Sequence, residues 1–163
     1  MTFEKDYSIE EQLNAKIKAI LGQYFIEKDV EADLERGQDF AIYVVHPFKV
    51  AVRLRRFDYF SAFHNEFTIR WARPFGTPTE IDKIRQGLVQ YFLYGFINEA
   101  ETEIIQYLLA DLTKFGSPIP FKIFPNDPHD SDLAVFKINQ FQKEFIIHSW
   151  CNPEYEKYKS NGE

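Results

Sequence analysis

Three stretches of alternating apolar and polar residues constrain the fold of this chain more than any other feature. They run over residues 39–45, 49–56 and 66–73. Because successive side chains of a strand point to opposite faces of a sheet, this alternation predicts three half-buried β-strands. The side chains expected on the core face are Phe40, Ile42, Val44, Val50, Val52, Leu54, Phe67, Ile69 and Trp71.

The opposite faces of the same strands carry charge. Arg53, Arg55 and Arg70 share this surface with Asp39 and Glu66. A guanidinium group stays charged and binds phosphate through two parallel hydrogen bonds, so the three arginines are candidate phosphate-binding residues. The alternative is that they form cross-strand ion pairs with the two acids, each contributing about 0.2–1 kcal/mol to stability.

Two helices are expected around these strands. A capping-box pattern at residues 8–11, followed by apolar residues at helical spacing, predicts a helix over about 9–21. Thr79, with Asp82 three residues later, predicts the start of a second helix over 79–94. Its apolar stripe comprises Ile81, Ile84, Leu88, Phe92 and Phe96.

The remaining elements are predicted to be strands. Residues 104–110 are apolar on both faces, as in a covered central strand. A short strand at 121–124 lies between prolines, and residues 133–138 and 145–148 are expected to pair as a hairpin.

These elements predict an α+β fold in one domain, residues 1–163. Its αβββαβ core with a mixed sheet is expected over about 8–111, followed by a C-terminal β extension over 112–150 that includes a β-hairpin, and by a frayed tail. A chain of 163 residues is long enough to bury roughly 70% of the surface that its unfolded form exposes.

Composition narrows the environment of the protein. With 17 Phe and 9 Tyr, the chain is much richer in aromatic residues than disordered proteins are. Cys151 is the only cysteine, which excludes an intrachain disulfide and a CxxC site. No apolar run approaches the ~20 residues of a membrane span and no signal peptide is recognisable, so we expect a cytoplasmic protein without a membrane partner.

Charge and motifs exclude several classes of function. The net charge of −6 disfavours non-specific nucleic-acid binding, although a local basic face remains open because arginines cluster between residues 53 and 85. GxSxG, HExxH, GxGxxG and GxxxxGK[ST] are all absent from the sequence. The absence of these motifs argues against a serine hydrolase, a zinc protease or a P-loop nucleotide-binding protein.

The expected order of helix, three strands, helix and strand resembles the core of the PD-(D/E)XK nuclease-like superfamily, which has a restriction-endonuclease-like fold. The resemblance covers about residues 8–111 and is carried by Asp39, by the acidic first helix, and by the second helix with its aromatic end at 90–96. In that family an Asp at the start of the first core strand binds metal, and an acid-x-lysine pair follows on the next strand.

This chain departs from the family pattern on the second strand, which offers Ala51-x-Arg53 or Arg53-x-Arg55. Some members move a catalytic group to the second helix. The resemblance then implies Asp39, Lys83 and Glu80 as catalytic residues, and Asp39, Glu11 and Glu80 as ligands of Mg²⁺. The alternative for Glu80 and Lys83 is an ordinary surface pair three residues apart, worth a few tenths of a kcal/mol.

Three functions follow as hypotheses. The first is a nucleic-acid-binding or metal-dependent nuclease-like domain, with an active hydrolase and a binding-only descendant both left open. The second is a small acidic protein that binds another protein, as regulatory and immunity proteins do; the charge of −6 and the many aromatics favour it. The third is a phosphate-ester binder that uses the same arginines.

Overall fold

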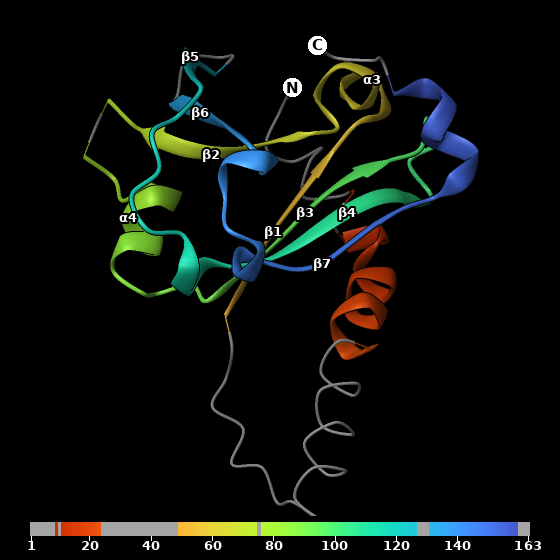
Figure 1. Ribbon diagram of the computed structural model, residues 1–163, viewed down its shortest axis with the longest axis horizontal. Coiled ribbons are helices and arrows are strands. Elements are labelled where there is room, and N and C mark those ends of the chain that lie inside the picture. The colour runs from red at the N-terminus through yellow and green to blue at the C-terminus, as the bar shows by residue number, and fades with distance from the viewer. Residues whose placement is uncertain (1–8, 10, 24–48, 75, 127–130, 160–163) are drawn as a thin grey trace, which may run out of the picture.

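The strands of this protein form two sheets. The structure, a computed structural model, describes residues 9, 11–23, 49–74, 76–126 and 131–159. Sheet A has the order β1-β3-β4-β7, and sheet B has the order β2-β6-β5 (Figure 1). The strands are β1 Val50–Arg55, β2 Glu66–Ala72, β3 Tyr91–Ile97, β4 Ile104–Asp111, β5 Lys122–Pro125, β6 Asp132–Lys137 and β7 Ile146–Cys151.

The α+β class and the mixed sheet predicted from the sequence are confirmed. In sheet A, β1 runs parallel to β3, while β4 is antiparallel to both β3 and β7. Sheet B is antiparallel throughout. The strand expected at residues 39–45 lies outside the described residues, and so does the part of the αβββαβ core that depends on it.

Short helices join the strands. The N-terminal helix is described at residue 9 and over 11–23, slightly beyond the predicted end at 21. The other helices are α3 Phe60–Phe63 and α4 Glu80–Arg85, with 3-10 helices η1 Phe57–Tyr59, η2 Leu112–Lys114, η3 Ile138–Gln140, η4 Lys143–Phe145 and η5 Pro153–Tyr158. No helix among the described residues is long and apolar enough to span a bilayer.

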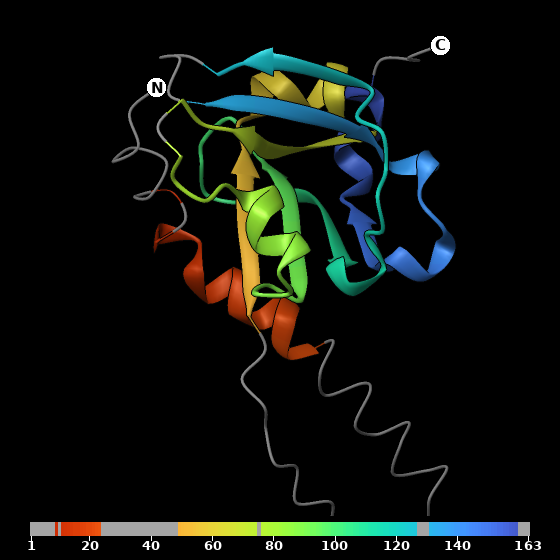
Figure 2. The same ribbon diagram turned by 90° about the vertical axis from the view of Figure 1, so that its left-hand side faces the viewer.

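Sheet A has a different apolar cluster on each face. The N-terminal helix covers one face (Figure 2). Its residues Ile9, Leu13 and Ile17 belong to the same apolar cluster as Leu93 and Leu109 of the sheet. As predicted, Val50, Val52 and Leu54 also lie on this core face. The second cluster lies between sheet A and sheet B and is largely aromatic.

Phe67 of β2 lies near the centre of the second cluster. Its ring lies 5.5 Å from the ring of Phe136 and 6.0 Å from that of Phe92, so it joins sheet B to sheet A. Phe141 and Phe145, from the segment between β6 and β7, stack on each other at 4.3 Å and also contact Phe67. The abundant phenylalanines therefore form the interface between the two sheets.

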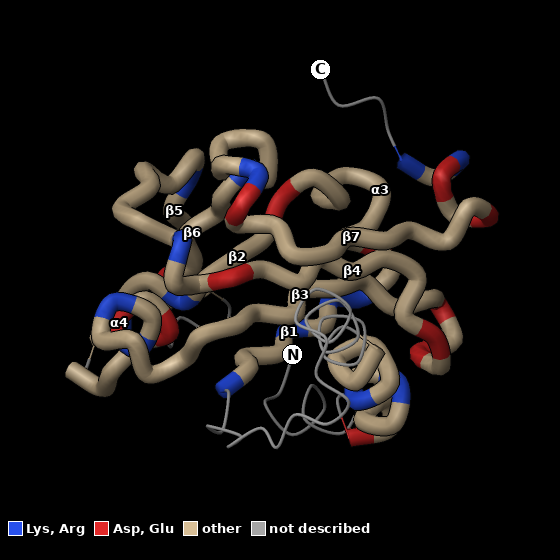
Figure 3. The backbone as a smooth tube through the Cα atoms, turned by 60° about the horizontal axis from the view of Figure 1, so that its bottom comes forward, with Lys and Arg blue, Asp and Glu red and all other residues tan. Residues whose placement is uncertain are grey.

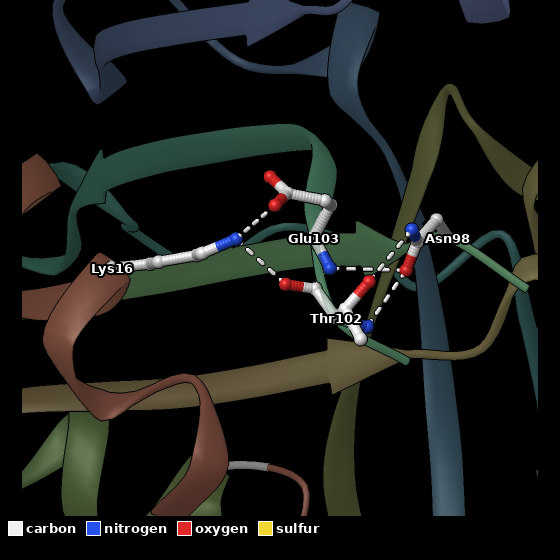
Figure 4. Close-up of polar contacts among 4 residues, drawn as sticks. All are labelled: Lys16, Asn98, Thr102 and Glu103. Carbon is white, nitrogen blue, oxygen red and sulfur yellow. Dashed lines mark hydrogen bonds and ion pairs between the residues drawn. The ribbon is translucent and has the colours of Figure 1, made fainter. Parts of the chain in front are cut away.

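The N-terminal helix is tied to the turn between β3 and β4 (Figure 4). Lys16 donates to the Thr102 carbonyl at 2.7 Å and forms an ion pair with Glu103. In the turn, Asn98 Oδ1 accepts hydrogen bonds from the backbone N–H groups of Thr102 and Glu103, at 2.8 and 3.0 Å. The turn is thus closed by Asn98 and anchored to the helix by Lys16.

The predicted helix over 79–94 is wrong beyond residue 85. Gly87 has φ +66°, in the left-handed region that helices use to end, and Leu88 of the expected stripe is exposed. The chain then continues as β3, where Phe92 and Phe96 are buried strand residues. The apolar spacing fitted a helix, but aromatic and β-branched residues on both faces favour a covered strand.

The predicted pairing of residues 133–138 with 145–148 is also wrong. β6 pairs with β2 and β5 in sheet B, whereas β7 pairs with β4 in sheet A. The segment between β6 and β7 contains η3 and η4, and it passes from one sheet to the other with Phe145 buried and Phe141 partly buried in the cluster between them. The C-terminal hairpin consists of β5 and β6 instead.

Gly95 provides a test of the packing in sheet A. A Cβ at this position would lie 2.8 Å from the Gln106 backbone oxygen and 3.2 Å from Leu54 Cδ2. Because β4 cannot move away without disturbing the sheet, Gly95→Ala is expected to lower the free energy of unfolding by about 1–3 kcal/mol, measured by urea denaturation.

Gly22→Ala is the matched control for this measurement. Gly22 is helical and a Cβ there would meet nothing within 4 Å, so alanine is expected to maintain stability or raise it by about 0.5–1 kcal/mol. Equal stability of Gly95→Ala and the wild type would contradict the close approach of β3 and β4.

Candidate functional site

The residues predicted to form a site come from different parts of the fold. Asp39 lies outside the described residues, and Glu11 is exposed on the N-terminal helix. Glu80 and Lys83 are on α4, Arg53 and Arg55 on β1, and Arg70 on β2. Glu80 is half-buried, whereas Lys83 is exposed.

Helix α4 begins with the capping box predicted at Thr79. Asp82 Oδ2 accepts hydrogen bonds from the Thr79 backbone N–H at 2.8 Å and from its hydroxyl at 2.7 Å. These bonds lower the pKa of the Asp82 carboxyl. The cap fixes the first turn of α4, in which Glu80 is the first residue.

Glu80 forms an ion pair with Arg53. Arg53 Nη2 donates to Glu80 Oε1, while its Nη1 donates to the Thr68 carbonyl at 3.2 Å and to the Thr68 hydroxyl at 3.3 Å. Glu80 Oε2 accepts the backbone N–H of Arg70 at 2.8 Å. The two side chains are 14% and 31% exposed, so solvent screens this pair less than a surface pair.

The ion pair covers the edge of β2 that faces away from β6. The backbone oxygen of Asn65, just before β2, accepts a hydrogen bond from the N–H of Ile138, just after β6. Asn65, Phe67 and Ile69 therefore direct their backbone groups toward β6. Backbone groups of a strand alternate between its two edges, so Thr68 and Arg70 point to the opposite edge. At that edge the Arg53 guanidinium donates to the Thr68 carbonyl, and the Glu80 carboxylate accepts the Arg70 N–H. The two side chains thus take the place of a neighbouring strand.

Three further arginines have partners of their own. Arg55 lies over the Tyr59 ring at 4.5 Å, and Arg85 lies over the Trp71 ring at 5.1 Å. Arg56 pairs with Glu101 at 3.2 Å. The predicted cross-strand pairing therefore does not describe Arg53, whose acidic partner comes from α4. Nor does Glu80 form the predicted surface pair with Lys83 among the described residues.

The residues nominated for Mg²⁺ are not brought together where the structure describes them. The N-terminal helix, with Glu11, packs on one face of sheet A, whereas Arg53 and Glu80 lie toward sheet B on the other. Glu80 is already paired with the Arg53 guanidinium, and its other oxygen accepts the Arg70 N–H, so a cation would have to compete with this ion pair. Within the described ranges, no three His, Cys, Asp or Glu side chains are grouped for a metal. The magnesium site stays a prediction that rests on Asp39.

A cavity of about 350 Å³ beside β7 contains Cys151 and several polar groups, among them His64, Glu156 and Lys159. Burial raises the pKa of the Cys151 thiol, which keeps it protonated and weakly nucleophilic at neutral pH. Lys159 pairs with Glu156 at 2.9 Å and lowers the pKa of that carboxyl. The Cys151 thiol is therefore not activated as a nucleophile by its surroundings in this cavity.

Sequence analysis missed an apolar surface on the segment that leads into β5. Ile119, Phe121 and Ile123 are 85%, 60% and 47% exposed. We call residues 118–125 the β5 ribbon; it is the sequence Pro-Ile-Pro-Phe-Lys-Ile-Phe-Pro. Prolines that alternate with large apolar residues were a signal for it, because proline cannot donate the hydrogen bond that a central strand needs.

Removing the Glu80 carboxylate tests its structural role. Glu80→Ala leaves the Arg53 guanidinium and the Arg70 N–H without their acceptor, and is expected to lower the free energy of unfolding by about 2–3 kcal/mol. Glu103→Ala, which breaks the more exposed pair with Lys16, is the control and should cost less than about 1 kcal/mol. Equal losses in urea denaturation would argue against the edge role.

The Thr79 cap predicts a pH dependence. Since the folded pKa of Asp82 is lowered, its contribution to stability is present above the unfolded pKa of about 3.9 and is lost as the pH falls through the folded pKa. The stability difference between the wild type and Asp82→Asn should therefore shrink below about pH 4. Thr79→Val removes the hydroxyl hydrogen bond and keeps the backbone one, so it should raise the Asp82 pKa in an NMR titration; an unchanged value would contradict the contribution of the hydroxyl.

The chain matches no model of a known family, no curated protein and no solved structure. The resemblance to the PD-(D/E)XK superfamily therefore rests on the sequence features given above and stays a prediction. What this protein does has to be inferred from the surfaces and contacts of its own fold.

Proposed function

We propose that this protein is a binding module for another protein and that the β5 ribbon is its contact surface. The observation that carries this proposal is the exposure of Ile119, Phe121 and Ile123 on one short segment. Single exposed apolar residues are common on protein surfaces. Here three large apolar side chains are exposed within five residues of one segment, and such a concentration favours an interaction site.

The position of the ribbon supports this role. β5 is at the edge of sheet B and pairs with β6; among the described strands it has no second neighbour. It lies on the far side of the molecule from the N-terminal helix (Figure 1). Burying each of the three side chains against a partner would contribute about 1.5–3 kcal/mol before the cost of association.

The internal contacts of Arg53 and Arg55 weaken the competing proposals. Arg53 is held by Glu80 and Thr68, and Arg55 lies over Tyr59. A phosphate group would have to replace these contacts before Arg53 could bind it. Nuclease activity, nucleic-acid binding and phosphate-ester binding stay predictions from the sequence, whereas protein binding has an exposed surface in its support.

The proposal is tested by screening a protein array with the labelled full chain. The test variant is Ile119→Ser/Phe121→Ser/Ile123→Ser, which removes the apolar surface without removing buried side chains. The control is Phe63→Ser/Leu88→Ser, which removes exposed apolar side chains elsewhere. We expect binders that lose at least about tenfold in affinity with the test variant and keep it with the control.

Matching urea denaturation midpoints of the two variants would show that folding is not the cause of lost binding. Absence of binders, or binders equally retained by the ribbon variant, would overturn the proposal.

A further inference from the structure

We infer that two copies of this chain pair through the open edge of β7 and form a reversible homodimer. The inference goes beyond the proposed function, because it concerns sheet A and not the β5 ribbon. It is carried by the outward backbone groups of β7, by the absence of charge along this strand and by the aromatic side chains on it.

The backbone of β7 is open on one side. Among the described strands, β7 is at the end of sheet A and pairs only with β4. Asn152 N donates to the Ile105 carbonyl at 2.8 Å. Backbone groups alternate along a strand, so Trp150 also points toward β4, whereas Ser149 and Cys151 direct their N–H and C=O groups toward the open edge. No hydrogen bond to these outward groups is found among the described residues.

The edge of β7 carries no formal charge. Residues 145–153 contain no Lys, Arg, Asp or Glu, although these four residue types make up 27% of the chain. Figure 3 shows β7 without a basic or acidic position. Edge strands are commonly kept apart by charged side chains, above all by lysine, and β7 lacks this protection. Two copies can therefore meet at this edge without contact between like charges, although each has a net charge of −6.

The register of the dimer follows from the outward backbone groups. When two identical strands pair antiparallel, a two-fold axis at an outward residue places that residue opposite itself. An axis at Cys151 would place Pro153 opposite Ser149, and proline has no N–H to donate. An axis at Ser149 avoids this loss. Ser149 of each copy then donates to, and accepts from, Ser149 of the other copy.

The same register makes the aromatic side chains of β7 complementary to themselves. Within one copy, the Tyr107 ring lies 5.6 Å from the His148 ring and 6.0 Å from the Trp150 ring. His148 is exposed, and Trp150 is 42% exposed. With the axis at Ser149, His148 of each copy lies opposite Trp150 of the other, and opposite side chains of neighbouring strands pack together. Each Trp150 then lies between Tyr107 of its own copy and His148 of the other.

These features favour a second copy over other occupants of the edge. A charged peptide would find no opposite charge on β7, and an unrelated strand would lack the aromatic side chains that the two-fold register places beside Trp150. Two six-residue strands joined edge to edge bury less surface than the roughly 1,200–2,000 Å² of a stable interface. The dimer is therefore expected to dissociate on dilution.

The test measures self-association of the full chain by sedimentation equilibrium over a range of concentrations. The variants are Ser149→Lys and Ser149→Glu, each alone and in an equimolar mixture. Because residue 149 lies opposite itself, each variant alone brings two like charges together, whereas the mixture brings opposite charges together. Ser117→Lys and Ser117→Glu are the matched controls, because Ser117 is exposed and lies outside β7.

We expect a wild-type dimer, self-association at least about tenfold weaker in Ser149→Lys and in Ser149→Glu, and recovery of association in their mixture. The Ser117 variants should associate as the wild type does. Recovery in the mixture would also show that both Ser149 variants are folded, because two unfolded chains could not restore the edge.

A wild type that stays monomeric up to about 1 mM would overturn the inference. So would self-association that both Ser149 variants leave unchanged, or a mixture that associates no more strongly than its components. The proposed function fails separately, when the protein array yields no binder that depends on the β5 ribbon. Ribbon-dependent binders of a monomeric chain would leave the proposed function standing and reject only the dimer.

Discussion

The architecture depends on the ion pair between Arg53 and Glu80. Arg53 belongs to β1, the outermost of the described strands of sheet A, Glu80 belongs to the first turn of α4, and their other hydrogen bonds go to Thr68 and Arg70 of β2 in sheet B. One contact thus joins both sheets and a helix. It also gives the Thr68 carbonyl a donor and the Arg70 N–H an acceptor on the side of β2 that faces away from β6. Without the ion pair these backbone groups would lose these partners. Loss of such partners costs more than the net value of a typical hydrogen bond.

This arrangement explains how far sequence analysis could reach at the candidate site. The alternation of residues 49–56 and 66–73 placed Arg53 and Arg70 on the polar faces of two strands, and the capping box placed Glu80 at the start of a helix. Their mutual contact was not predictable, since it depends on β2 joining a different sheet from β1. Charged side chains that form ion pairs with each other and charged side chains that bind a ligand give the same sequence pattern.

The errors in the fold have a related cause. Strands with apolar residues on both faces, such as β3, carry no period that separates them from a buried helix, and Gly87 was the local signal that decided between them. The half-buried strands β1 and β2 were predictable within one or two residues, because each has one face that must avoid water. Pairing partners were the least predictable, since β6 and β7 are close in sequence but belong to different sheets.

The interleaving of the two sheets has a consequence for biosynthesis. The strands of the two sheets alternate along the chain. Of the sheet B strands, β2 lies in sequence between β1 and β3, and the β5–β6 hairpin lies between β4 and β7, all four of which belong to sheet A. When β2 leaves the ribosome, its described partner β6 has not yet been made. Phe67 can meet Phe92 of β3 earlier, but it lacks Phe136, Phe141 and Phe145 until residue 145 has emerged. Such non-local pairing slows folding, and an aromatic segment that stays unpaired during synthesis is exposed to aggregation.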